Sequence, residues 1–193
     1  FGWEMENEAV LVEAYNRATD CGLKIHRLAN HQVSHSVYIF DPEGNYNEFY
    51  ADASDNWRDI WRPGNTDVLT VKWQPESADK SEKPRYEADP DLVSAAGAMI
   101  PSEQIGHAVI VAQEYEALLD FYKNVAGLDV SQTGSDDSYA VLTGPLGRRD
   151  LVVLPSIDGR SPGMHHVGFE VQSELHVEEA EVKLKEMGIP IEA

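Results

Sequence analysis

The sequence predicts an α+β fold built from repeated units in which a strand, a helix and further strands follow one another. Residues 105–112 form a β-branched run that suits a buried strand. Residues 114–125 then place apolar side chains on one face of a helix, which Gly127 closes. Strand-like stretches follow at 138–142 and 150–154, so a strand–helix–strand order is expected here.

The same order begins again near the end of the chain. Residues 164–171 resemble another strand, and a helix is expected from about 174 to 187. This strand matches the first five residues of the chain, with glycine, aromatic and glutamate positions in common. An offset of 166 residues also relates two pairs of glycines that lie 20 residues apart, namely Gly2 with Gly22 and Gly168 with Gly188.

Composition suggests where the packed regions end. Residues 63–102 are rich in proline, serine and charge, apart from a short strand expected at 68–73, and we interpret them as a linker lying against a surface. A loop within one domain is the alternative, but so long a loop is unusual. The expected organisation is therefore a first unit at 1–62, the linker at 63–102, and a second region at 103–193.

The charge balance restricts the partners. The 193 residues include 15 Lys and Arg against 34 Asp and Glu, a formal charge of −19. Such a charge repels phosphate backbones and anionic lipids, so no nucleic-acid or membrane partner is expected. The single cysteine, Cys21, and the lack of a leader-like start favour a cytoplasmic protein. A homo-oligomer is compatible with the sequence, which does not fix the oligomeric state.

Two histidines occupy the same phase of the strands at 105–112 and 164–171. They are His107 and His166, and paired strands would direct both imidazoles into one cavity. Neutral imidazoles with a carboxylate suit Fe(II), Mn(II), Zn(II) or Ni(II). The alternative is that both are ordinary core or surface histidines.

A hairpin supplies a second set of polar side chains. Asp-Pro-Glu-Gly-Asn is a turn sequence that joins strands expected at 36–40 and 47–50. Alternation places Glu48 and Tyr50 on one face, and Tyr38 on the facing strand points towards the same side. The alternative is a stable hairpin with a solvated Glu48 and with His31 as a loop residue.

These features resemble the vicinal oxygen chelate superfamily, which contains glyoxalases, bleomycin-resistance proteins and type I extradiol dioxygenases. The resemblance rests on the βαβββ order, on the two strands with histidines, and on the hairpin from Ser36 to Tyr50. It covers residues 1–60 and 103–193 and is closest to two-module ring-cleaving (catechol 2,3-) dioxygenases. Paired βαβββ units forming such modules, incomplete at both ends, are therefore the expected fold.

The resemblance implies roles for particular residues. His107 and His166 match the two metal-binding histidines, and His166 is preferred to His165 because it shares the phase of His107. Glu48 matches the metal-binding glutamate, and His31 and Tyr38 match the active-site histidine and tyrosine, but all three lie in the preceding module. The implied reaction is ring cleavage of a small catechol-type aromatic substrate by O₂ at Fe(II).

The sequence also departs from the family pattern. The glutamate that would accompany His107 and His166 falls near position 214, beyond Ala193, and a histidine position falls one residue before Phe1. We therefore expect a piece of a chain of ~300 residues, the size of two domains. Arg149 lies in the stretch where related dioxygenases often have an acid–base histidine, and it cannot exchange protons at neutral pH.

Two other functions remain compatible with these residues. One is a glyoxalase-like metal lyase or isomerase, in which the metal polarises a carbonyl without O₂. The other is a metal-free binding protein that sequesters a small aromatic molecule, as resistance proteins of this superfamily do.

Overall fold

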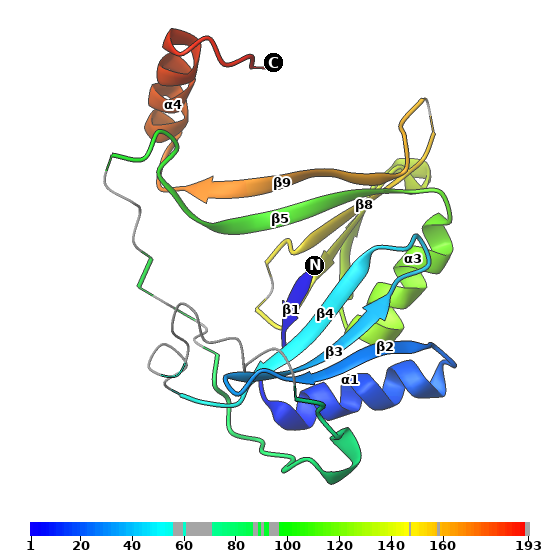
Figure 1. Ribbon diagram of the computed structural model, residues 1–193. Coiled ribbons are helices and arrows are strands. Elements are labelled where there is room, and N and C mark those ends of the chain that lie inside the picture. Colours follow the sequence, from blue (N-terminus) through cyan, green and yellow to red (C-terminus); the bar gives the residue numbers. More distant parts are fainter. Residues whose placement is uncertain are drawn as a thin grey trace.

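Two β-sheets organise the chain in a computed structural model that describes residues 1–55, 60, 71–86, 89, 91–92, 97–146, 148–157 and 159–191 (Figure 1). No helix in these ranges has the length and apolar character needed to cross a membrane. The strands and helices, in chain order, are β1 (Gly2–Glu4), α1 (Glu8–Asp20), β2 (Ile25–Asn30), β3 (Ser34–Phe40), β4 (Tyr46–Asp52), β5 (Ser102–Ala112), α3 (Tyr115–Phe121), β6 (Asp129–Thr133), β7 (Ala140–Thr143), β8 (Leu151–Pro155), β9 (Gly163–Val171) and α4 (Glu174–Glu186).

The two sheets share one topology. The first has the strand order β1-β4-β3-β2 and the second β6-β7-β8-β5-β9. In each, the strand before the helix runs parallel to the last strand of its unit, β1 beside β4 and β5 beside β8, and the other pairs are antiparallel. The chain therefore contains two βαβββ units, which confirms the predicted α+β class.

A third unit begins with β9 and α4. Helix α4 starts and ends 166 residues after α1, because Glu8–Asp20 is followed by Glu174–Glu186. Gly22 and Gly188 close the two helices with left-handed φ angles of 73° and 71°, a conformation that glycine adopts without steric cost. The structure thus confirms the repeat found in the sequence.

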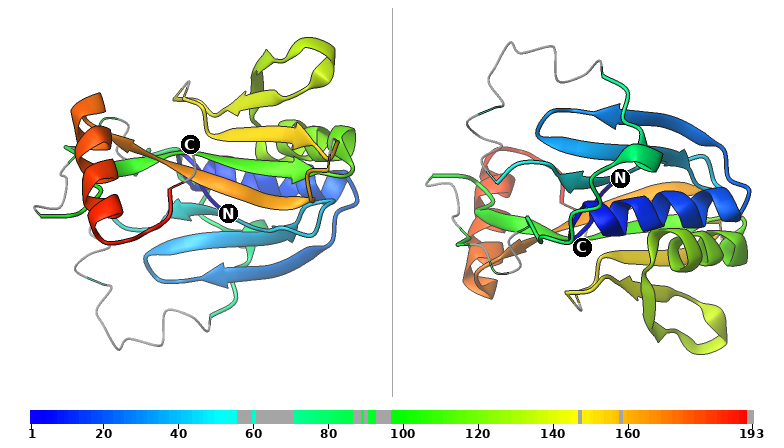
Figure 2. Two further views of the ribbon diagram at one scale, coloured as in Figure 1. Left: turned by 90° about the horizontal axis from the view of Figure 1, so that it is seen from above. Right: turned by 90° about the horizontal axis from the view of Figure 1, so that it is seen from below.

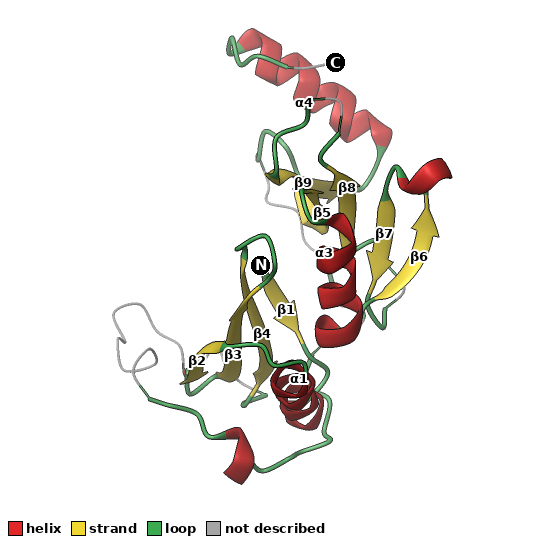
Figure 3. Cartoon of the chain, turned by 90° about the vertical axis from the view of Figure 1, so that its right-hand side faces the viewer, coloured by secondary structure: helices red, strands yellow, loops and turns green. Residues whose placement is uncertain are grey.

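The two copies of this helix differ in their packing. Helix α1 buries Leu11, Val12 and Ala18 against the first sheet. In α4 only Ala180 is buried among the described residues, and the helix stands away from both sheets at the end of β9 (Figure 3). The repeat relates the two helices in the sequence, but their burial depends on the strands beside them.

One hydrophobic core joins the two parts of the chain that we call the first module, from β1 to β4, and the second module, from β5 to α4. Helices α1 and α3 lie side by side between the sheets (Figure 2). A π-helical turn, Tyr122–Ala126, extends α3 towards the first module, and the Arg17 guanidinium donates to the Val125 carbonyl at 3.3 Å. The Trp3 and Tyr122 rings meet with centroids 5.6 Å apart. The modules therefore share packed side chains.

Part of the expected linker lies on the first module. The Asn30 amide donates to the Val71 carbonyl at 2.9 Å, and the Ala9 amide donates to the Ser81 carbonyl at 3.2 Å. The strand expected at 68–73 is represented by this one β-bridge at Val71, since residues 68–70 lie outside the described residues.

One strand was not expected. Strand β6 carries Asp-Val-Ser-Gln-Thr, and all five residues are exposed at the edge of the second sheet. An edge strand without a buried face has no apolar alternation, which is the signal that sequence analysis uses.

Candidate functional site

The β3–β4 hairpin positions the polar residues of the first module. Tyr38 pairs with Glu48 and Ser36 with Tyr50 in the antiparallel register, so these four side chains share one face. Asp41 holds the turn, where its Oδ1 accepts from the Asn45 amide at 2.8 Å and from the Glu43 amide at 3.0 Å. The opposite face of the hairpin packs against α1. We call the face that carries Tyr38 and Glu48 the open face of the first sheet.

Three predicted site residues meet on this open face. Glu48 Oε1 accepts hydrogen bonds from the Tyr38 hydroxyl at 2.6 Å and from Ser36 Oγ at 2.8 Å. His31 Nε2 lies 3.0 Å from the Tyr38 oxygen and 3.8 Å from Glu48 Oε1. Sequence alternation predicted Tyr38 and Glu48 together, but not Ser36, whose role depends on the register.

The electrostatics give the network a direction. Burial, and then the hydrogen bond to the Glu48 carboxylate, raise the pKa of Tyr38 far above its usual value. The phenol therefore keeps its proton at neutral pH and donates a hydrogen bond to Glu48. Its oxygen is then an acceptor for His31 Nε2–H, so protons are ordered from His31 through Tyr38 to Glu48. This arrangement holds and orients protons at one edge of the face.

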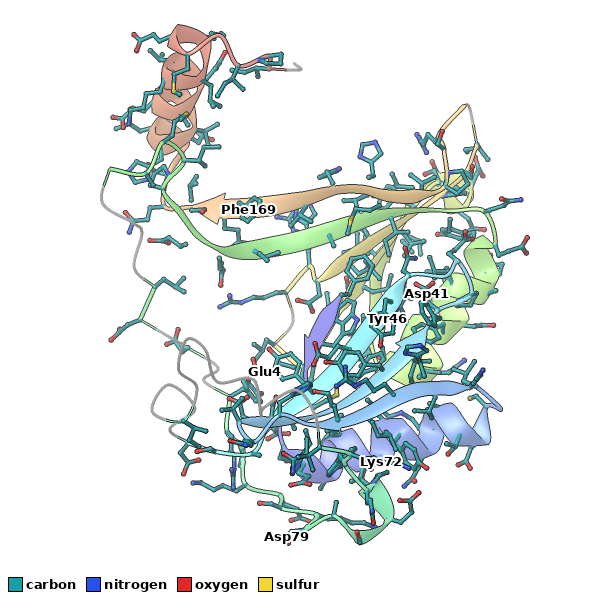
Figure 4. All side chains as sticks on the ribbon, viewed as in Figure 1. Glu4, Asp41, Tyr46, Lys72, Asp79 and Phe169 are labelled. Carbon is teal, nitrogen blue, oxygen red and sulfur yellow. The ribbon has the colours of Figure 1, made fainter. Side chains whose placement is uncertain are left out.

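Further carboxylates lie along the same face. Glu4 on β1 pairs with Tyr50 in the register and accepts a hydrogen bond from its hydroxyl. Burial, and then the nearby charge of Asp52, raise the pKa of Glu4 above its ordinary value. Figure 4 shows Glu4 and Tyr46 on the first sheet, on the side away from α1. The open face thus carries carboxylates on β1 and β4.

The second module brings two histidines together. β5 and β9 pair antiparallel, with His107 opposite Gly168 and His166 opposite Val109. The two imidazole centroids are 5.8 Å apart and the rings are nearly perpendicular. Burial first, and then the positive charge of Arg149, lower the pKa of His107, while Glu170 opposes the change. The neutral imidazole that results is the form that binds a metal.

The predicted metal ligands are only partly assembled. The imidazole centroids are 5.8 Å apart, and on a shared zinc ion each ligand nitrogen would lie ~2.1 Å from the metal. Glu48 lies in the other sheet, on β4, where it is bonded to Ser36 and Tyr38. Among the described residues, no group of three or more His, Cys, Asp or Glu is arranged to hold a metal. His107, His166 and Glu48 as ligands of one metal ion stay a prediction.

The absence of a side chain at Gly168 leaves space for the His107 imidazole. A Cβ atom added at Gly168 would lie 2.4 Å from His107 Cε1, nearer than real contacts allow. At Gly2, the equivalent residue of the first module, the nearest atom to an added Cβ would be Tyr50 Cε1 at 3.7 Å, an ordinary contact. A side chain at residue 168 would therefore displace the imidazole.

The different surroundings of Gly168 and Gly2 give a prediction about stability. We expect Gly168→Ala to lower the free energy of unfolding by about 1–3 kcal/mol through overpacking. The matched Gly2→Ala change should stay within about 0.5 kcal/mol of the parent. Urea unfolding followed by circular dichroism measures both, and equal effects of the two variants would contradict this account of Gly168.

The order of the strands and helices defines a protein of tandem βαβββ units, and comparisons agree. Residues 104–193 match the family model of the Glyoxalase/Bleomycin resistance protein/Dioxygenase superfamily. No curated protein matches the sequence significantly. The match to this superfamily in sequence is confined to residues 104–193, and the match in fold extends over both modules.

Solved structures of this fold include both dioxygenases and a glyoxalase. The Mn(II)-bound glyoxalase from Novosphingobium aromaticivorans is 16% identical with a TM-score of 0.62, over 97% of this chain and 50% of that one. BphC, a halotolerant catechol dioxygenase, is 20% identical with a TM-score of 0.62, over 98% and 56%. The 2,2',3-trihydroxybiphenyl 1,2-dioxygenase from Sphingomonas wittichii strain RW1 is 15% identical with a TM-score of 0.63, over 98% and 58%. The chain thus spans between half and three fifths of these structures.

Proposed function

We propose that this chain is part of a metal-dependent extradiol dioxygenase that cleaves a catechol-type aromatic with O₂. The observation that carries the proposal is the pair of imidazoles, His107 and His166, on one face of adjacent strands, with Gly168 leaving room for the first. Two histidines with an open remainder are the ligand arrangement of non-haem Fe(II) oxygenases, which add one carboxylate.

Each group of residues has its own part in this proposal. His107 and His166 would hold the ion, Fe(II) by preference and Mn(II), Zn(II) or Ni(II) otherwise. When bound, such an ion acts as a Lewis acid towards the substrate oxygens and orients the reactants. On the open face of the first sheet, His31 would release and take back the proton that Nε2 carries, and Tyr38 would hold an oxygen of the substrate by its hydroxyl.

Oxygen consumption tests the proposal. The protein is loaded with Fe(II) without air, mixed with catechol and then exposed to O₂, while an electrode and the yellow absorbance of a ring-fission product are recorded. We expect one O₂ consumed per product formed. Absence of product from several catechols would contradict the proposal, and turnover with Ni(II) or Zn(II) but without O₂ uptake would place the protein with the glyoxalases instead.

The proton-ordering network has a separate test. We expect His31→Asn to lower kcat of the iron-loaded protein by about 10²–10⁴-fold, the usual contribution of general acid–base catalysis. Tyr139→Phe serves as the control, because Tyr139 is bonded to Gln132 at the far edge of the second sheet. Full activity of the His31 variant in steady-state assays would exclude His31 from the reaction.

A further inference from the structure

A cavity of about 350 Å³ lies on the face of the first sheet that carries α1. Its wall is formed by Glu8 of α1, Asn30 of β2, His35 of β3 and residues 72–74 and 77–79 of the predicted linker. Alternation along β3 directs His35 away from the face that carries Tyr38, so this cavity is separate from the open face. We call it the linker cavity. Its volume lies within the ~300–1,000 Å³ that is typical of small-molecule sites.

Contacts with α1, β2 and β3 hold the wall of the linker cavity in place. The His35 ring stacks on Trp73, with centroids 5.4 Å apart and planes inclined by 14°. His35 Nδ1 lies 2.8 Å from Glu8 Oε1, and the Asn30 amide donates to the Val71 carbonyl at 2.9 Å. Because these contacts anchor the linker to the first module, the cavity is organised before any ligand enters.

Trp73 brings a buried donor without an acceptor to this wall. The residue is 4% exposed, and among the described residues its indole Nε1–H has no hydrogen-bond partner. Buried N–H groups are nearly always bonded to protein, water or a ligand, because an unpaired one costs free energy. The Trp3 indole, by contrast, donates to Asn47 Oδ1 at 2.8 Å. An acceptor oxygen on a molecule in the linker cavity would satisfy the Trp73 N–H.

The charged groups of the wall favour a ligand with both signs of charge. Glu8 is engaged by a histidine imidazole, whereas Lys72 and Asp79, on the α1 side of the first sheet (Figure 4), form no ion pair within the described ranges. The Lys72 ammonium also attracts the Glu76 carboxylate, but from beyond ion-pair distance. The net charge of −19 repels a simple anion, and a simple cation would leave the Trp73 N–H unpaired. A small zwitterion offers a carboxylate to Trp73 and Lys72 and an ammonium to Asp79.

We propose that the linker cavity binds a small zwitterion that carries an ammonium and a carboxylate, such as a free amino acid. The carboxylate accepts a hydrogen bond from Trp73 Nε1 and pairs with Lys72, and the ammonium pairs with Asp79. The site requires neither a metal nor O₂, so it is independent of the proposed dioxygenase. Because the ligand binds the folded chain, it would stabilise the attachment of the linker to the first module.

The indole signals of ¹⁵N-labelled protein test the site directly. L-alanine and γ-aminobutyrate, whose charges lie at a short and at a longer separation, are titrated in excess EDTA while ¹H–¹⁵N spectra are recorded. We expect at least one of them to move the assigned Trp73 Nε1–H signal in a saturable way. The Trp3 signal should stay in place, because its N–H already has an acceptor. A Trp73 signal that moves with neither probe would overturn the proposal.

Matched ligands and variants test the assigned charges. The single-charge analogues, propionate and ethylamine for L-alanine and butyrate and propylamine for γ-aminobutyrate, should bind about 5-fold more weakly than the zwitterion. Lys72→Gln and Asp79→Asn should each weaken binding of the zwitterion about 2- to 5-fold, the effect of one exposed ion pair. Lys123→Gln after α3 and Asp129→Asn on β6 remove the same charges from the second module and should leave binding unchanged. Circular dichroism verifies that each variant is folded. Equal binding of a single-charge analogue, or equal losses in the control variants, would contradict a zwitterion site.

Discussion

Replacing Tyr122 by alanine is expected to lower the free energy of unfolding by about 3–5 kcal/mol, the usual cost of deleting a large buried aromatic ring. Tyr122 has no exposed surface, and its ring packs on Trp3 in the other module. The deletion would leave a cavity between α1, the first sheet and the turn that follows α3. The effect should appear as a lower midpoint in urea unfolding.

The Tyr122 hydroxyl contributes separately. It donates to Asp41 Oδ2 at 2.9 Å and lies 3.3 Å from Asn47 Oδ1, and Asp41 is only 5% exposed. Burial, and then the Asp41 charge, raise the pKa of Tyr122 well above its usual range, so the hydroxyl remains a donor throughout the accessible pH range. We expect Tyr122→Phe to cost about 1–3 kcal/mol, because the buried Asp41 carboxylate loses one of its hydrogen-bond donors. Tyr139→Phe is the control, and a Tyr122→Phe protein with parental stability would show that the hydroxyl contributes nothing.

These bonds explain why the modules are expected to unfold together. Asp41 holds the hairpin turn that precedes β4, and Tyr122 follows α3 in the second module. A single core therefore includes the buried face of the first sheet and helix α3 of the second module. One unfolding transition, seen equally by tryptophan fluorescence and circular dichroism, is the expected result.

The repeat could be predicted from the sequence because its signals are local. Gly22 and Gly188 mark helix ends through backbone conformation, and their equal spacing from Gly2 and Gly168 can be read without any tertiary information. For the same reason Tyr38 and Glu48 could be placed on one face of the hairpin, since alternation is a property of the strand itself.

The remaining features depend on neighbours that sequence patterns do not contain. Ser36 joins Glu48, and the Phe40 and Tyr46 rings meet, only in the register in which Tyr38 faces Glu48 and Phe40 faces Tyr46. The phase of a strand also does not tell to which sheet it belongs. Sequence analysis named Glu48, His107 and His166 as ligands by resemblance and placed Glu48 in the preceding module, and in the structure Glu48 lies in the first sheet and the histidines in the second.

The histidine pair gives the largest expected effect on function. We expect His107→Ala and His166→Ala each to weaken binding of Fe(II) or Mn(II) by more than the 10- to 100-fold that follows loss of an outer partner of a metal ligand. Loss of a ligand removes a bond to the ion itself, so the effect on metal content and on any O₂ uptake should be larger still. Metal titration under anaerobic conditions, followed by elemental analysis of the dialysed protein, measures it.

His165→Ala distinguishes a true ligand pair from a cluster of surface histidines. His165 is adjacent in sequence, and its Nδ1 lies 2.7 Å from His166 Nδ1, whereas His107 lies across the strand pair from His166, with ring centroids 5.8 Å apart. The pair across the strands is therefore His107 with His166, and removal of His165 should weaken metal binding less than removal of either. If His165→Ala instead abolished binding while His107→Ala left it unchanged, the ion would be held by His165 and His166 of β9. The His107–His166 pair, on which the proposed dioxygenase rests, would then not bind the metal.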